Sequence, residues 1–270
     1  MGGTLKKMAT TLGDVVEYEL RIGDEHIPLN PLLGKPIHLT YTGNIYCDAC
    51  GRATNKSFAQ GHCYPCMSSL ARCDMCILKP ETCHFAAGTC REPEWGERNC
   101  MIEHVVYLAN TSGLKVGITR HSQIPTRWMD QGATQAMPMF RVRTRHIAGL
   151  VETDMATRMA DKTNWRALLK GNGDPIDLAA SAAAAEPELI PALEALVDAR
   201  GDDAVTRVKE DVVTIRYPVL EFPTKITSHN FDKNPAVSGT LMGIKGQYLI
   251  FDTGAINMRK FTGYEVDFDA

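Results

Sequence analysis

The chain has 270 residues, a net charge of −3 at neutral pH and a hydrophobic content of 44%. These values are typical of a soluble globular protein with one to three domains, and they argue weakly against a general nucleic-acid coat protein. No run of about 18 apolar residues is present, so no membrane span is expected. The first residues carry two lysines without a following apolar stretch, which is unlike a secretory signal, and we expect a cytoplasmic location.

Residues 1–46 are predicted to be rich in β-strands. VVEYELRIG (15–23) alternates between apolar and polar residues, and KPIHLTYTGNIYC (35–47) leads a further strand into the cysteine-rich region. Residues 211–270 return to β-structure, with glycine-punctuated runs that suggest a small, strongly bent sheet or barrel. We therefore predict that the N- and C-terminal strands form one discontinuous β-rich domain.

All nine cysteines fall within residues 47–103, which lack regular periodicity. In a cytoplasmic protein this concentration indicates metal binding rather than disulfides. The first two CxxC pairs are separated by 12 residues. Each CxxC turn presents two thiolates at the separation that one tetrahedral zinc requires, as in a zinc ribbon. The predicted ligands of this zinc are Cys47, Cys50, Cys63 and Cys66.

A second group of thiols follows and predicts a second zinc. The chosen ligands are Cys73, Cys76, Cys83 and Cys90. His84, Cys100 and His104 are alternative ligands. Interleaved pairing of the two groups, or burial of some thiols as small apolar side chains, is also open. All-thiolate shells leave no coordination position for water, so both zinc ions are expected to be structural.

Residues 104–173 predict a small α/β unit that begins with a hairpin. HVVYLA and LKVGIT (114–119) read as two strands joined by the turn NTSG. The hairpin brings Tyr107 and Lys115 together, and Pro125 suits the first turn of a helix that points Arg127 towards them. A phenol, an ammonium and a guanidinium around one groove suit a bound phosphate.

A strand at PMFRVRTRHI (138–147) and a helix over about 151–169 complete this unit. Residues 174–210 are rich in alanine and acidic residues and predict a helical segment that bridges two domains. The expected fold class is therefore α+β, with an α/β core, a zinc-ribbon module and a terminal β-rich domain.

VVY (105–107) followed by KVGIT (115–119), with an arginine ten residues after the glycine, resembles the core of the GIY-YIG endonuclease superfamily. The similarity is closest to a bacterial branch whose second motif reads KIG. It implies that Tyr107 lies near the scissile phosphate, that Arg127 contacts the phosphate, and that Glu152 holds one Mg²⁺ or Mn²⁺ ion. Asp154 and Asp161 are alternative metal ligands.

Two departures from the superfamily pattern favour other functions. Lys115 stands where the second motif has a tyrosine, and the two motifs are closer together than usual. One alternative is therefore a protein that binds DNA or RNA without cutting it. Another is a zinc-stabilised protein-interaction scaffold, which the net negative charge and the acidic helix favour.

The distribution of charge agrees with a nucleic-acid partner. Residues 110–146 contain six Lys or Arg against one acid, Asp130, whereas residues 174–211 contain ten acids. The first region suits a polyanion and the second would repel it, although charge runs are commonly no more than solvated faces. Besides Lys115 and Arg127, the candidate contact residues are Arg120, Arg141, Arg143 and Arg145.

Overall fold

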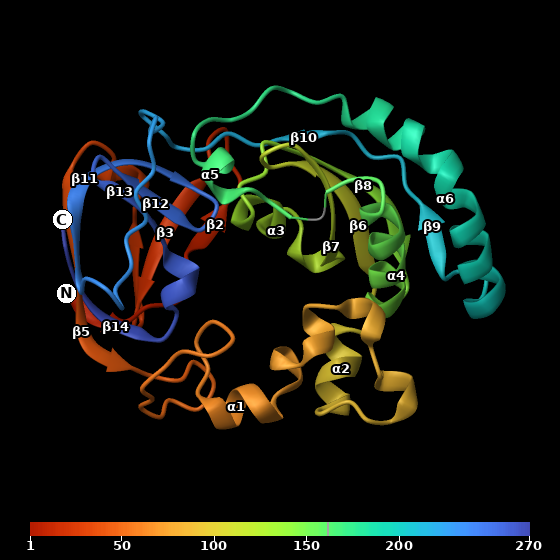
Figure 1. The fold of residues 1–270 in the computed structure, drawn as a ribbon, viewed down its shortest axis with the longest axis horizontal. Coiled ribbons are helices and arrows are strands. Elements are labelled where there is room, and N and C mark those ends of the chain that lie inside the picture. The colour runs from red at the N-terminus through yellow and green to blue at the C-terminus, as the bar shows by residue number, and fades with distance from the viewer. Residues whose placement is uncertain (161) are drawn as a thin grey trace.

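The computed structural model describes residues 1–160 and 162–270, and it contains a β-rich domain, a cysteine-rich module and an α/β core (Figure 1). Helices and several antiparallel sheets occur together, which confirms the predicted α+β class. The cysteine-rich module lies below both other parts in the view of Figure 1, and the two termini lie close together at the edge of the β-rich domain.

Strands from both ends of the chain share one antiparallel sheet in the order β1-β14-β5-β11-β12-β13. Their bounds are β1 Gly2–Thr4, β5 Pro36–Ile45, β11 Ala236–Lys245, β12 Tyr248–Phe251, β13 Gly254–Asn257 and β14 Tyr264–Asp269. Because β5 pairs with β14 on one side and with β11 on the other, the discontinuous β-rich domain is confirmed.

A three-stranded sheet faces this larger sheet across a hydrophobic core. Its strands are β2 Ala9–Thr11, β3 Glu17–Ile22 and β4 Glu25–Pro28. The alternation read from the sequence is visible in β3, where Tyr18, Leu20 and Ile22 are buried and the residues between them are not. The short 3₁₀ turns η1 Asn30–Leu32 and η7 Met258–Phe261 belong to the same domain.

The cysteine-rich module contains two short helices, α1 Tyr64–Ser69 and α2 Pro93–Asn99. Four single 3₁₀ turns lie between them: η2 Ala71–Cys73, η3 Met75–Ile77, η4 Pro80–Thr82 and η5 Phe85–Ala87. Such short elements bury little apolar surface of their own, so the module depends on other interactions, including those of its thiols.

The α/β core is built on the predicted hairpin, which is confirmed. The sheet order is β10-β8-β6-β7, with β9 also paired to β8. The strands are β6 His104–Asn110, β7 Leu114–Arg120, β8 Gln135–Val142, β9 Val205–Arg207 and β10 Val213–Thr214. The turn η6 His121–Gln123 and the helix α3 Thr126–Asp130 follow β7, so the helix that carries Arg127 is also confirmed.

The next helix differs from the prediction. α4 spans Arg145–Ala156 rather than about 151–169, and only α5, Trp165–Leu168, occupies the end of the predicted range. Thr144 caps α4, because its hydroxyl accepts a hydrogen bond from the backbone N–H of Ile147 (3.3 Å). The cap ends the preceding strand early, so TRHI belongs to the helix start and not to β8.

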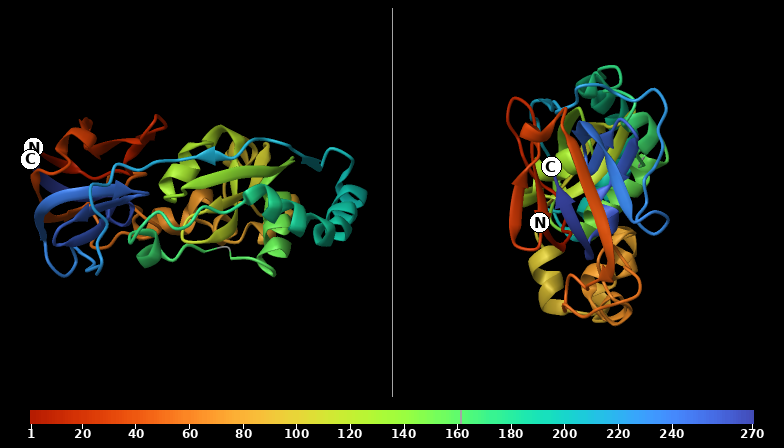
Figure 2. Two further views of the ribbon diagram at one scale, coloured as in Figure 1. Left: turned by 90° about the horizontal axis from the view of Figure 1, so that it is seen from above. Right: turned by 90° about the vertical axis from the view of Figure 1, so that its left-hand side faces the viewer.

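α6 spans Leu178–Arg200 and ends at Gly201, as the sequence predicts. Its residues Leu189 and Leu193 pack with α4 on one face of the core sheet. Figure 2 shows that α6 lies at the end of the molecule farthest from the β-rich domain. Among the described residues, no helix combines the length and the apolar character that a membrane crossing needs.

The two faces of the core sheet belong to different hydrophobic cores. Val106 and Leu108 point to the α4 and α6 side. Val105 and Tyr107 point the other way, into a core that continues through Trp128 to the β-rich domain. The alternation of β6 therefore fixes Tyr107 on the face covered by α3 and the terminal strands.

We expect the substitution Gly149→Ala to lower the free energy of unfolding. In the interior of an exposed helix, replacing glycine by alanine would normally raise the free energy of unfolding by about 0.5–1 kcal/mol. Here the new Cβ would lie 2.6 Å from the backbone nitrogen of Glu81 and 2.7 Å from Pro80, and such overpacking costs about 1–3 kcal/mol.

Urea unfolding in zinc-containing buffer measures this change, with Thr153→Ala, on the exposed side of the same helix, as the control. A G149A protein as stable as the parent would contradict the close packing of α4 on η4.

Candidate metal and phosphate sites

The thiols of Cys47, Cys50, Cys63 and Cys66 form one cluster. Their sulfur atoms all lie within 4.8 Å of one another, and the Sγ atoms of Cys50 and Cys63 are 3.8 Å apart. Two ligands of a tetrahedral zinc with Zn–S bonds of 2.3 Å are separated by about 3.8 Å. The geometry is therefore compatible with the predicted zinc.

Local backbone structure places these four thiols. Cys47 follows the end of β5, and Cys63 immediately precedes α1. Gly51, at φ +71°, lets the chain turn so that its N–H donates to the carbonyl of Cys47 (2.8 Å). Burial raises the pKa of the Cys47 thiol, but the backbone amides of Cys63, Cys50 and Ala49 outweigh it and lower the pKa to about 6. A thiolate stabilised in this way suits a metal ligand.

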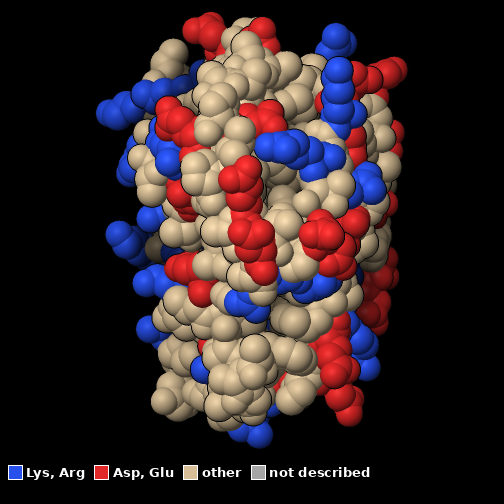
Figure 3. All heavy atoms as spheres, turned by 90° about the vertical axis from the view of Figure 1, so that its right-hand side faces the viewer, with Lys and Arg blue, Asp and Glu red and all other residues tan. Residues whose placement is uncertain are grey.

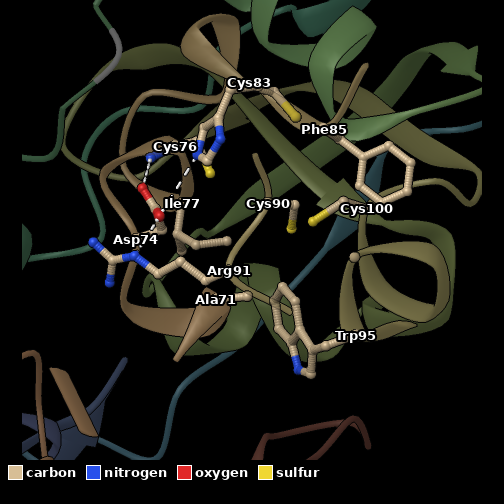
Figure 4. A pocket seen from close by; sticks show the side chains of 12 residues that line it. Ala71, Asp74, Cys76, Ile77, Cys83, Phe85, Cys90, Arg91, Trp95 and Cys100 are labelled. Carbon is tan, nitrogen blue, oxygen red and sulfur yellow. Dashed lines mark hydrogen bonds and ion pairs between the residues drawn. The ribbon is translucent and has the colours of Figure 1, made fainter. Parts of the chain in front are cut away.

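A second group of thiols lines a cavity in the other half of the module (Figure 4). Cys76, Cys83, Cys90 and Cys100 face this cavity together with Phe85 and Trp95. Cys73, which the sequence assigned to this group, does not line it, whereas Cys100, an alternative, does. The chain turns between η2 and η3, so the two thiols of the Cys73–Cys76 pair face different surroundings, which spacing alone does not reveal.

Asp74, Cys76 and His84 also lie close enough to share a metal ion, with ligand atoms within 4.8 Å. Asp74 is already bound, because its carboxylate pairs with Arg91 Nε (2.6 Å) and faces His84 Nε2 (3.6 Å). The other predicted alternative, His104, is fully buried and does not line the cavity. Its Nδ1 is 2.8 Å from the carbonyl oxygen of Ile102, and burial lowers the pKa of its imidazole to about 4.

Tyr107 lies across Gly117 on the neighbouring strand. The two residues are direct partners in the β6–β7 register, and a Cβ at Gly117 would be 2.7 Å from both Cζ and Oη of the tyrosine. The phenol therefore extends over β7, where its hydroxyl donates to Gln131 Oε1 (2.8 Å). Tyr107 is fully buried, and its ring meets Trp128 edge to face.

Arg127 and Glu152, which lie on two different helices, both influence the pKa of this phenol. Burial raises the pKa of Tyr107 to about 12; the Arg127 guanidinium opposes this rise and the Glu152 carboxylate adds to it. Both side chains are half-buried, unlike the tyrosine. Lys115 pairs with Ala109, two residues from the Tyr107–Gly117 pair, so it lies on the same face of the sheet and is 4% exposed.

The position of Glu152 in its helix differs from the prediction. It lies in the second half of α4 and not at the helix start, so attraction to the helix N-terminus does not account for a carboxylate at this position. Asp154, an alternative metal ligand in the prediction, instead forms an i,i+4 ion pair with Arg158 (2.9 Å). Asp161, the other alternative, lies outside the described residues.

The four arginines predicted to contact nucleic acid are engaged within the protein. Arg141 pairs with Glu210 (2.9 Å) and Arg143 with Asp203 (2.7 Å), so two acids of the acidic segment neutralise two arginines of the basic one. The face that carries α6 and β9 accordingly shows Lys and Arg interspersed with Asp and Glu (Figure 3). The remaining two donate to the module, Arg120 to Asn99 Oδ1 (2.6 Å) and Arg145 to the Ile77 carbonyl (2.7 Å).

Two residues were not predicted in the roles that the structure gives them. Gln131 is the hydrogen-bond partner of the phenol, and Arg145 links α4 to the cysteine-rich module. The pKa of Arg145 is lowered mainly by burial, and its other electrostatic neighbours include Cys100, Arg127 and Glu152. The spacing could have indicated Gln131, because it lies four residues after Arg127 and therefore on the same face of the predicted helix.

The structure is that of an α+β protein with a four-cysteine cluster compatible with zinc, and with a buried tyrosine whose pKa is influenced by an arginine and a glutamate. Residues 34–266 match the family described as Protein of unknown function (DUF2797), and the chain belongs to that family. The match begins just before β5 and ends within β14, so it spans all three parts of the molecule. Comparison with curated proteins and with solved structures gives no match.

We expect the substitution Gly117→Ala to destabilise the protein through Tyr107. The phenol is too well packed to move away from a new methyl group, so a cost of about 1–3 kcal/mol is expected. In a Tyr107→Ala background the same substitution should cost far less. Urea unfolding of the four proteins measures the coupling free energy, and an equal cost in both backgrounds would contradict the contact.

Proposed function

We propose that this protein is a zinc-stabilised nucleic-acid-binding protein and an endonuclease of the GIY-YIG type. One observation carries the proposal: the Arg127 guanidinium from α3 and the Glu152 carboxylate from α4 both act electrostatically on the phenol of Tyr107, which extends from β6 over β7, the last strand of the core sheet. These are the three positions that the resemblance assigns to catalysis, and 45 residues of chain separate the first from the last. This electrostatic influence supports a shared site rather than three independent structural roles.

The raised pKa of Tyr107 decides between two roles for the phenol. At neutral pH a group with a pKa of about 12 keeps its proton, so it is poorly suited to remove a proton from water. It remains able to donate a hydrogen bond, as it does to Gln131. We infer that Tyr107 orients the attacking water or the scissile phosphate.

Arg127 and Lys115 supply the positive charge. A guanidinium offers several donors in a fixed plane and suits two phosphate oxygens at once. Arg127 is half-buried, so it is shielded from solvent but still open to a ligand. Lys115 replaces the tyrosine of the second motif on the same face, where an ammonium adds attraction for the developing negative charge.

Glu152 fits a divalent ion. Mg²⁺ usually keeps several waters and is held by one or two carboxylates together with substrate phosphates, so a single half-buried carboxylate beside a phosphate site suffices. A Mg²⁺ or Mn²⁺ ion held there would polarise a phosphate oxygen and stabilise the leaving oxygen.

The cysteine-rich module offers a surface for the rest of the nucleic acid. No acidic residue occurs in the sequence from Gly51 to Arg72, and Arg52, Lys56 and Arg72 are all exposed. These exposed cations suit a polyanion better than the arginines that are paired with carboxylates. The zinc would be structural here, because its four thiolates complete the tetrahedral shell.

A second candidate function is binding of nucleic acid without cleavage. The full burial of Tyr107, whose hydroxyl already has Gln131 as a partner, favours this alternative. A phosphate could bind the hydroxyl only if the groups that bury it, including Gln131, moved. The exposed cations of the module would serve either function equally well.

Cleavage of labelled single- and double-stranded DNA and RNA in Mg²⁺ or Mn²⁺ tests the proposal. We expect the zinc-loaded protein to cut at least one of these, and Tyr107→Phe, Arg127→Ala and Glu152→Ala each to reduce the rate by at least about 100-fold. Arg158→Ala, two residues beyond the end of α4 and paired with Glu188, is the control and should cut like the parent.

Binding measured at several salt concentrations completes the test. A protein that binds in a salt-dependent way but never cuts would support the second candidate. A protein that binds none of the four nucleic acids would contradict both and favour a protein-interaction scaffold.

A further inference from the structure

We propose that the second cavity of the module is a structural zinc site whose ligands are Cys76, Cys83, Cys90 and Cys100, and that this zinc holds α4 in place. The inference does not depend on the nuclease proposal. It assigns a metal to a cavity in the half of the module that packs against the core, and it leaves Cys73 outside the ligand set.

The four thiols come from four separate segments. Cys76 lies in η3, Cys83 follows η4, Cys90 precedes α2 and Cys100 follows α2. All four line one cavity, as Figure 4 shows, and its other lining residues include the apolar side chains of Phe85 and Trp95. None of the nine cysteines of the chain forms a disulfide. Four reduced thiols around one partly enclosed space match the donor set of structural zinc.

The four thiols are more widely spaced than those of the first cluster, because their sulfur atoms do not all lie within 4.8 Å of one another. They line the same cavity, so a bound zinc ion would draw them together around it.

Cys73 has different neighbours. Its side chain does not line the cavity, and the charged groups with the largest effect on its pKa are Arg72, Arg91, Cys47 and Glu92. None of the four cavity thiols is among them. The side chain therefore belongs to the region between the two cysteine groups, although it is only three residues from Cys76.

Asp74 and His84 serve the site from outside. The Asp74 carboxylate accepts a hydrogen bond from the backbone N–H of Cys76 (3.4 Å) and pairs with Arg91. His84 Nδ1 is 2.8 Å from Thr89 Oγ1. These contacts orient the loops that carry the ligands, which is the usual role of groups that surround a metal shell.

The same loops hold the start of α4. The backbone N–H of Arg145 donates to the carbonyl of Cys100 (2.8 Å), and its guanidinium donates to the carbonyl of Ile77 (2.7 Å). Gly149 packs directly on Pro80. Each anchor point lies at a proposed zinc ligand or within three residues of one, so loss of the metal would loosen the helix that carries Glu152.

Zinc content of purified protein, measured by inductively coupled plasma mass spectrometry, tests the ligand set. We expect two zinc ions per chain in the parent and in Cys73→Ser, but one in Cys83→Ser and in Cys100→Ser. Cys66→Ser should also hold one, through loss of the first site. A parent with a single zinc, or loss of zinc in C73S but not in C100S, would overturn the proposal.

Alkylation of the zinc-loaded parent avoids variants that fail to fold. Cys73, Cys83 and Cys90 are all half-buried, so exposure alone predicts similar labelling by iodoacetamide. We expect mass spectrometry to find Cys73 labelled and the other two protected until a chelator is added. Protection of Cys73 together with labelling of Cys83 or Cys90 would contradict the assignment.

Hydrogen exchange tests the effect on α4. Backbone amides of Arg145–Ala156 should exchange at least about tenfold faster in Cys83→Ser than in Cys73→Ser. Equal exchange in the two proteins would show that the second metal does not support the helix.

Discussion

The contact between Tyr107 and Gly117 governs the geometry of the core. Only a residue without a side chain lets the phenol cross β7, and this crossing carries the hydroxyl to the region that Arg127 and Glu152 also reach. The alternation of β6 sends its neighbours Val106 and Leu108 to the opposite face, where α4 and α6 cover them. One close approach between adjacent strands therefore determines where the hydroxyl of Tyr107 lies.

The two other parts of the molecule support opposite sides of this site. The β-rich domain holds α3, because Asp130 binds both Lys7 and Gln247, and Tyr217 donates to the carbonyl of Ala133 (2.8 Å). The cysteine-rich module holds α4 through Arg145 and Gly149. Because Arg127 and Glu152 lie on these two helices, their separation depends on how both parts pack against the core.

The sequence predicted those features that depend on residues close together in the chain. The hairpin follows from two β-rich runs around a turn, and the first thiol cluster follows from the spacing of two CxxC pairs. The choice between Cys73 and Cys100 depends on the path of the chain between η2 and α2, which spacing does not contain. The burial of Tyr107 could not be predicted from the sequence, because the hydrophobic core that contains it is assembled from strands of both ends of the chain.

A crystal structure of the zinc-loaded protein soaked in Mn²⁺, with anomalous diffraction recorded at the manganese and zinc edges, tests the proposed phosphate site most directly. We expect a manganese peak beside the Glu152 carboxylate, within reach of Tyr107 and Arg127 and distinct from the zinc positions among the cysteines. A structure in which manganese binds elsewhere, and Glu152 is occupied only by protein groups, would contradict a metal-assisted phosphate site at β7.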